Sequence, residues 1–428
     1  MANRYSVKTL VLGSGERLPV LLSSATGQPL FEPTIYSLVE LRATNKATST
    51  IGHMLRSVMV LLLFLDARRV DLDERIRSGQ VLEISEIDAL ARFCRLPLDQ
   101  QTDSSDMRER DTLRPRVASM EKIRFAKQMP PRAEVCAHTA ANRIRVIGDY
   151  LDWLVKARLS TFATTSNLHT KLLSASQRCK DALKSRVASP MRRNTIGQRE
   201  GAAPEVVARL LEVVSPSSPN NPWISDHVKA RNELIVHWML GLGVRRGELL
   251  NIKISDIDFR REEVTIARRA DDPVDPRRDQ PRVKTRDRKL PLSTGLCQMA
   301  HDYVINVRCK IDGARKHEFL LVADRTGGPM SLSSLNKAFV YLRENCSGIP
   351  GNLEPHVLRH TWNDSFSERM DKAGTTEAEE QQMRSFLMGW SPTSDSAATY
   401  TRRHVRKKAQ QVSLEMQAKQ VKGMQGDE

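Results

Sequence analysis

The chain has few cysteines, and none of them are closely spaced. Its 428 residues include six cysteines and no CxxC motif, and the cysteines stand at positions 94, 136, 179, 297, 309 and 346. Disulfide frameworks and structural zinc sites both need cysteines at short, recurring spacings. The sequence therefore predicts reduced thiols in a cytoplasmic protein, with neither a disulfide framework nor a metal site.

Long apolar runs are also missing. The most apolar run, Val58–Leu65, is far shorter than the roughly 20 residues that a membrane span needs, and it predicts a buried helix. Residues 1–11 contain Arg4 and Lys8 and have no apolar stretch, which is not the pattern of a signal peptide. We expect no membrane attachment.

Positive charge is in excess. The 67 Lys and Arg residues outnumber the 51 Asp and Glu residues, which gives a net charge of +16. Cationic side chains that bind phosphates release condensed counterions, so this balance favours a nucleic-acid partner. A generically basic protein has the same composition. A chain of this length is expected to fold as two or three domains.

The N-terminal half is predicted to be mainly helical. Residues 1–45 alternate apolar and polar positions around Gly13-Ser14-Gly15, which predicts a β-hairpin. Apolar residues then recur at helical spacing within 49–69 and again within 139–157, which predicts a helical domain over 46–185.

Two polar stretches interrupt this half of the chain. Residues 100–131 carry charges of mixed sign and predict a solvated loop. Residues 180–199 are basic, predict a linker that contacts phosphates, and place the domain boundary near 190–200. A second domain is expected over 200–428.

The second domain is expected to be mostly helical with a small sheet. Helices are predicted at 204–214, 232–242, 294–307 and 331–342, and strands at 264–267, 288–292 and 319–322. A short helix is expected to restart at Val244, after the glycines of Gly241-Leu242-Gly243. The long basic connection between the first two strands has no role that the sequence reveals.

Several polar side chains of this domain could serve a phosphate site. His356 and Arg359 are three residues apart in PHVLRH and share one helix face. Arg245 follows the glycine break, where Glu248 can hold its guanidinium. Lys284 is expected near the return strand of the basic connection, as a flexible lysine of a hairpin. Each of these residues taken alone could have a nonspecific role, such as a surface ion pair or one phosphate-contacting cation among many.

Their order along the chain is more specific than any single motif. The candidates are Arg245 in GVRRGEL, Lys284 in VKTRDRKLPL, His356 and Arg359 in HVLRH, Trp390 in LMGW, and Tyr400. This set resembles the catalytic set of the tyrosine recombinases, or phage integrase family, over about residues 200–410. The spacing from Trp390 to Tyr400 is slightly longer than is usual in that family.

The chemistry of these residues suits phosphodiester exchange without a metal or cofactor. Tyr400 can be the nucleophile, because a phenolic oxygen leaves more readily than an alkoxide and makes the covalent step reversible. Arg245 and Arg359 can clamp the nonbridging oxygens with bidentate geometry. His356 is the candidate base or hydrogen-bond donor, and Lys284 the candidate acid toward the 5′ oxygen. The resemblance places Trp390 where it donates to phosphate.

Other tyrosines and a zinc site are weaker candidates. Tyr5, Tyr36, Tyr150, Tyr303 and Tyr341 fall in a hairpin or in amphipathic helices, where packing is the expected role. His356 and His360 have the spacing of two helical zinc ligands, but the glutamate of a metalloprotease motif is missing between them. We therefore interpret His360 as a structural residue.

The resemblance implies a mainly α fold with a small β-sheet, in which a helical core-binding domain precedes a mixed catalytic domain. It further implies a site-specific DNA recombinase that forms a 3′-phosphotyrosyl intermediate during integration, excision or transposition of a mobile element. The expected partners are double-stranded DNA, other protomers in a tetramer, and helper proteins, in a bacterial or phage setting at the nucleoid. The alternatives are a type IB topoisomerase and a DNA-binding protein that lacks catalysis.

Overall fold

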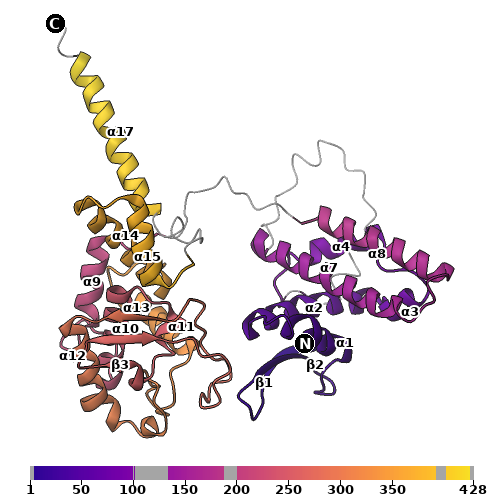
Figure 1. The fold of residues 1–428 in the computed structure, drawn as a ribbon, viewed down its shortest axis with the longest axis horizontal. Helices are drawn as coiled ribbons and strands as arrows, with labels where there is room; N and C mark the ends of the chain where they lie inside the picture. The colour runs from indigo at the N-terminus through magenta and orange to yellow at the C-terminus, as the bar shows by residue number, and fades with distance from the viewer. Residues whose placement is uncertain (1–3, 100, 102–133, 188–199, 392–401, 425–428) are drawn as a thin grey trace, which may run out of the picture. The chain divides into compact units, whose positions relative to one another are not determined.

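The computed structural model describes residues 4–99, 101, 134–187, 200–391 and 402–424 (Figure 1). The chain divides into two compact units, residues 1–12 with 17–195 and residues 13–16 with 196–428. Each unit has its own apolar core. The boundaries and roles of the expected segments stay predictions; these segments are 1–45, 46–185 and 200–428.

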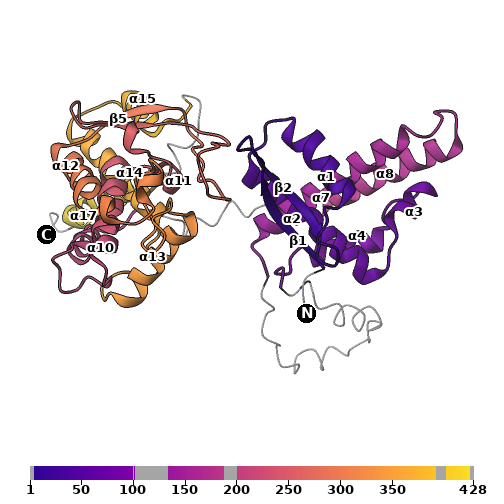
Figure 2. The same ribbon diagram turned by 90° about the horizontal axis from the view of Figure 1, so that it is seen from below.

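The first unit begins with the expected hairpin. Strand β1 (Tyr5–Val11) pairs antiparallel with β2 (Arg17–Ser23). The hairpin packs against helix α2 (Thr48–Arg68), and Figure 2 shows the helix next to the two strands. Apolar residues occupy most of the circumference of α2. The helix is long and apolar enough to cross a membrane, but 67% of its most apolar window is buried inside the protein. It is therefore the core helix of this unit.

The other helices of the first unit pack on α2 or on one another. They are α1 (Phe31–Tyr36) with a π-helical turn (Ser37–Arg42), α3 (Leu72–Arg77), α4 (Ile84–Phe93), α7 (Ala137–Leu159) and α8 (Asn167–Ser185). Helix α7 packs against both α2 and α8. Residues 180–185 belong to α8, so the predicted basic linker begins later than expected. The predicted charged loop at 100–131 lies outside the described residues, apart from Gln101.

The second unit is built around α10. Its helices are α9 (Pro204–Val214), α10 (Asp226–Leu242), α11 (Arg246–Leu249), α12 (Thr294–Asp302), α13 (Leu332–Asn345), α14 (Pro355–Lys372), α15 (Glu377–Met388) and α17 (Arg402–Met424). Helix α10 packs against α9, α12 and α14, and Trp238 on α10 is completely buried. Helix α10 begins earlier than predicted, since the polar residues of its first turn hide its helical period.

A small antiparallel sheet completes the second unit. Its strands are β3 (Ile257–Asp258), β4 (Glu263–Ile266) and β5 (Arg288–Pro291), in the order β3-β4-β5. The strand predicted at 319–322 was wrong, because Phe319 and Val322 each form only a single bridge, to Lys253 and Pro329. The helix predicted over 294–307 is α12 followed by a π-helical turn (Tyr303–Val307). Short 3₁₀ turns occupy Ile254–Asp256, Arg308–Lys310 and Ala314–Lys316.

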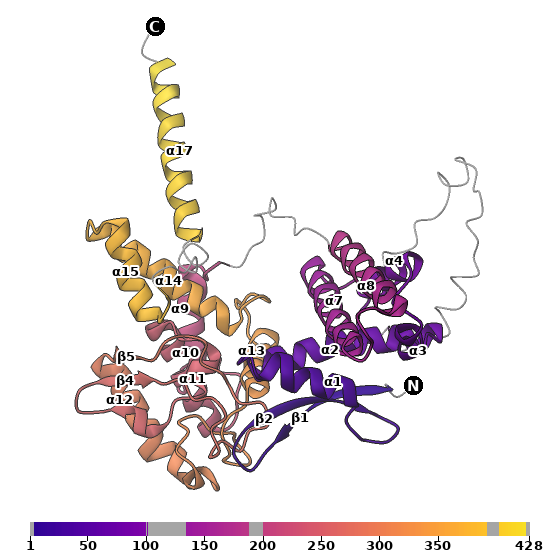
Figure 3. The ribbon, with the colours of Figure 1, turned by 45° about the vertical axis from the view of Figure 1, so that its right-hand side comes forward.

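Helix α17 extends away from the rest of the second unit (Figures 1 and 3). Its first turns lie against α14, where Lys408 Nζ is 2.9 Å from an Asp371 oxygen, and Arg406 pairs with Glu200 at 2.8 Å. Four of its apolar side chains, Val405, Val412, Leu414 and Met416, are more than half exposed.

Candidate active site

A buried carboxylate, Glu248, lies at the centre of the predicted site. Helix α10 ends at Gly243, whose positive φ of 60° lets the chain turn sharply into α11. A Cβ on Gly243 would lie 2.8 Å from the Trp362 ring, so glycine is required there. Glu248 then reaches back to the start of α11, where its Oε2 accepts from the backbone N–H of Arg245 at 3.0 Å. The expected contact between Arg245 and Glu248 is present, with Nη1 3.2 Å from Oε1.

Glu248 also contacts residues from distant parts of the chain. Arg288, the first residue of β5, places Nη2 2.9 Å from Glu248 Oε2, and the hydroxyl of Thr285 donates to Oε1 at 2.8 Å. Arg359 of α14 places Nη1 3.9 Å from Oε2. One carboxylate therefore collects three guanidinium groups and a hydroxyl at a position with no solvent exposure.

The charge state of Glu248 follows from these contacts. Burial raises the pKa of this carboxyl group, but the positive charges of Arg288, Arg359 and Arg245 outweigh burial and lower the pKa to about 2. Glu248 is thus ionised at neutral pH, and its charge balances part of the positive charge around it.

Arg359 and Trp390 lie side by side. The Arg359 side chain is completely buried, its Nη1 donates to the Gly243 carbonyl at 2.6 Å, and its Cζ lies 5.6 Å from the centre of the Trp390 ring. Trp390 follows Gly389, which ends α15 with a positive φ of 64°. Packing of α14 on α10 and the turn after α15 therefore bring Arg359, Trp390 and Arg245 to the same carboxylate-centred cluster.

His356 and His360 are one turn apart on α14. Their ring centres are 4.8 Å apart in an edge-to-face arrangement, with His356 partly exposed and His360 buried. Among the residues that the structure describes, no group of three or more His, Cys, Asp or Glu side chains could hold a metal ion. The geometry is that of a packed histidine pair.

Lys284 lies near the return strand β5, as the sequence predicts, at the end of a long connection and not at the tip of a tight hairpin. It precedes β5 and is exposed between two buried residues, Val283 and Thr285. The backbone of this segment is confined on two sides. The carbonyl oxygen of Arg282 would lie 2.5 Å from a Cβ on Gly247, and the Arg286 N–H donates to the Gly389 carbonyl at 3.0 Å. The backbone next to Lys284 is therefore held in place, while its side chain extends into solvent.

Tyr400 lies outside the described residues, so its position relative to the other candidates stays a prediction. Three of the competing tyrosines are buried within the two cores: Tyr36, Tyr150 and Tyr303. Burial raises the pKa of Tyr303 to about 12, and its hydroxyl is 3.2 Å from His227 Nε2. A buried phenol with a raised pKa is a poor nucleophile, which agrees with a packing role for these residues.

Residues 204–406 match the model of the phage integrase family. This part of the chain belongs to that family. It spans all the candidate positions from Arg245 to Tyr400, and the family is that of the tyrosine-type site-specific recombinases. The integrase-family domain makes the chain an enzyme of DNA recombination, and its mainly helical fold with a small sheet is the one expected.

Solved structures of such recombinases are similar to this chain at a low level. The XerA recombinase is 21% identical over 63% of this chain and 82% of its own, with a TM-score of 0.36. The Tn1549 transposon integrase in complex with transposon right end DNA is 16% identical over 76% and 85%, with a TM-score of 0.41. A lambda integrase dimer bound to a COC′ core site is 13% identical over 92% and 94%, with a TM-score of 0.35. A search of the curated proteins found no match.

Sequence reasoning missed Thr285 and Arg288 of the integrase-family domain. Arg288 is almost fully buried, and besides Glu248 it contacts the Thr285 hydroxyl at 3.0 Å and the Leu387 carbonyl at 2.6 Å. The signal was present in VKTRDRKLPL, where an arginine begins the strand after the lysine. It could not be recognised without knowing that Glu248 is buried and needs more than one cation.

Proposed function

We propose that this chain cleaves and rejoins DNA strands through a 3′-phosphotyrosyl intermediate, with Tyr400 as the nucleophile. One observation supports this most strongly. Within an integrase-family domain, Glu248 holds Arg245 and Arg359 together, and Trp390 lies against Arg359. Two guanidinium groups at one place provide the preorganised positive charge that a pentacoordinate phosphoryl group needs.

Each remaining candidate has a role in the proposed reaction. The Tyr400 oxygen attacks phosphorus, the bond from phosphorus to the 5′ oxygen breaks, and Lys284 protonates the departing oxygen. His356 accepts the phenolic proton or donates a hydrogen bond to phosphate. Arg359 is completely buried, so the proposal requires that its guanidinium becomes accessible to the phosphate when DNA binds. No metal or cofactor takes part in any of these steps.

The proposed partners follow from charge and from the family. Double-stranded DNA is the substrate, with a helical N-terminal domain as a second clamp, and the reaction serves integration, excision or transposition of a mobile element in a bacterial or phage setting. Four protomers act on two paired sites. The exposed apolar residues of α17 are the candidate surface for docking on a neighbouring protomer. We place the protein in the cytoplasm, at the nucleoid.

The test uses nicked suicide duplexes from the DNA that flanks the gene, incubated with the full chain in the presence of a chelator. We expect a denaturation-resistant protein–DNA adduct that is lost in Tyr400→Phe. An adduct that persists in Tyr400→Phe, or none on any flanking duplex, would refute the proposed mechanism. Relaxation of a supercoiled plasmid that lacks the site would instead indicate a type IB topoisomerase.

A further inference from the structure

The connection between β4 and β5 is much longer than the sheet requires. Ile266 and Arg288 are directly opposite each other in the two strands, and such strands can be joined by a turn of about two residues. Here the strand bounds leave residues 267–287 between them. We call these residues the excursion. A connection of this length without helices or strands is usually either functional or unstructured.

The excursion has a buried anchor at Arg277. Its Nε and Nη2 bind the two oxygens of Asp275 at 2.9 and 2.8 Å, and its Nη1 donates to the carbonyls of Leu250 and Met330, both at 2.9 Å. Its Cζ lies 4.4 Å from the centre of the buried Phe319 ring. A planar fork makes all of these contacts at once, and a lysine ammonium group cannot.

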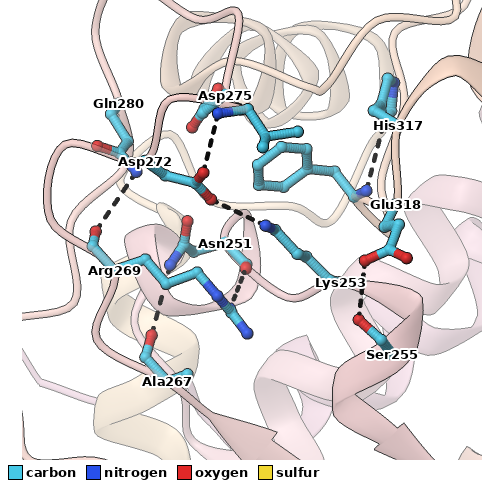
Figure 4. A network of polar contacts seen from close by, with 12 residues as sticks. Asn251, Lys253, Ser255, Ala267, Arg269, Asp272, Asp275, Gln280, His317 and Glu318 are labelled. Carbon is cyan, nitrogen blue, oxygen red and sulfur yellow. Dashed lines mark hydrogen bonds and ion pairs between the residues drawn. The ribbon is translucent and has the colours of Figure 1, made fainter. Parts of the chain in front are cut away.

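Two further ion pairs attach the excursion to the chain that follows α11. Lys253 Nζ is 2.9 Å from an Asp272 oxygen and 5.3 Å from the centre of the Phe319 ring. Arg269 pairs with Asp256 and also donates to the Asn251 carbonyl at 3.3 Å. Figure 4 shows Lys253, Asp272 and Arg269 side by side in this network. Cations held in this way are occupied by carboxylates and are not presented to a DNA backbone.

The anchored part leads directly to Lys284. Gln280 is buried and its Nε2 is 3.4 Å from the Arg269 carbonyl, which ties the return path to the outgoing path. The backbone N–H of Arg268 donates to Asp287 at 2.6 Å and closes the base of the excursion. The segment from Arg282 then lies against Gly247, as described above. The structure thus holds the backbone on both sides of Lys284.

We propose that Arg277 is a positioning residue for Lys284, which it serves by keeping the excursion folded before DNA binds. This inference rests on the proposed function, in which the Lys284 ammonium proton moves to the 5′ oxygen as the bond to phosphorus breaks. Arg277 itself is buried and its guanidinium is bound by Asp275 and two carbonyl groups, so it acts through the excursion. Its loss slows the step that needs the proton and leaves the affinity for DNA largely unchanged.

The test compares Arg277→Lys with Arg278→Lys, the same substitution at the exposed neighbouring position. Single-turnover cleavage is measured on a suicide duplex with the ordinary 5′ oxygen and on one with sulfur in its place. A thiolate leaves without a proton, because a thiol is far more acidic than an alcohol. We expect Arg277→Lys to cleave the oxygen duplex about tenfold or more slowly and the sulfur duplex at the wild-type rate. Arg278→Lys should match wild type on both.

An equal loss on both duplexes would overturn the proposal, and so would wild-type cleavage of the oxygen duplex by Arg277→Lys. A loss that appears only as weaker DNA binding, with a steeper or shallower salt dependence, would also overturn it. If the wild type forms no adduct at all, the proposed function fails. The folded excursion is then still tested on its own by amide hydrogen exchange of the DNA-free wild type.

Hydrogen exchange also covers the case in which Arg277→Lys does not fold. The N–H groups of Val274, Asp275 and Arg277 donate to oxygens within the excursion. We expect these amides to exchange far more slowly in the DNA-free protein than in an unfolded chain. Unprotected exchange there would show that the excursion is not preformed and would refute the inference.

Discussion

Replacing Glu248 by glutamine tests the central electrostatic feature of the site. The substitution keeps the shape of the side chain and removes its charge, which leaves Arg288 and Arg359 buried without a carboxylate between them. The ordinary pKa of 4.5 falls to about 2 in the folded protein, a shift that corresponds to roughly 3 kcal/mol. Removing one partner of a buried ion pair costs about 3–5 kcal/mol in general. We therefore expect Glu248→Gln to lower the free energy of unfolding of the second unit by about 3 kcal/mol at pH 7.

The pH dependence of this effect has a definite sign. A carboxyl group whose pKa is lower in the folded state contributes stability above its unfolded pKa, and that contribution disappears as the pH falls through the folded pKa. The wild type should lose the stability that the Glu248 charge contributes between about pH 4.5 and pH 2. The glutamine of Glu248→Gln does not titrate, so this variant should show no corresponding loss. The two proteins should therefore approach each other in stability at low pH.

Urea unfolding followed by tryptophan fluorescence measures this difference, because four of the five tryptophans, at 223, 238, 362 and 390, lie in the second unit. Glu344→Gln on the exposed face of α13 is the matched control and should not change the unfolding curve. A loss below about 1 kcal/mol for Glu248→Gln, or a difference between variant and wild type that is the same at pH 3 and pH 7, would refute the reasoning.

Three further predictions concern the two cores and the site. Gly247→Ala should lower the free energy of unfolding by about 1–3 kcal/mol and reduce adduct formation, because its Cβ would lie 2.5 Å from a carbonyl oxygen of the excursion. The control is Gly295→Ala, which has open space around it and should leave stability unchanged or increased in the same urea titration. Phe64→Ala should lower the stability of the first unit by about 3–5 kcal/mol and shift only that unit's transition in calorimetry; a shift of both transitions would contradict two separate cores. Tyr303→Phe should lose about 1 kcal/mol with its hydrogen bond to His227 but keep full adduct formation; loss of the adduct without unfolding would make Tyr303 a rival nucleophile.

Local patterns predicted the helices best where apolar residues recur at helical spacing. The helix at 204–214 has the bounds of α9, and α2 and α7 differ from their predicted ranges by a few residues at most. The N-terminal hairpin was also predicted, because alternation and a Gly-Ser-Gly turn are local signals. The strand predicted at 319–322 failed, since Phe319 packs against Arg277 of the excursion and Lys253 after α11, and forms only a single bridge to Lys253.

The candidate site could be predicted only in part. The order of motifs identified Arg245, Arg359 and Trp390, which the structure places together, and it suggested the contact between Arg245 and Glu248. The sequence could not show that Glu248 is buried, because its burial depends on β5 and α14 closing over α11. The sequence also indicated no role for the long basic connection between β4 and β5, because the burial of Arg277 with Asp275 depends on contacts with distant parts of the chain.

The most direct measurement identifies the residue that is joined to DNA. The trapped adduct is digested with protease and nuclease, and the peptide that carries the nucleotide is sequenced by mass spectrometry. The account predicts a single modified residue, Tyr400, linked to the phosphate at a 3′ end. A nucleotide on any other tyrosine, on a serine, or on the 5′ side of the break would contradict it.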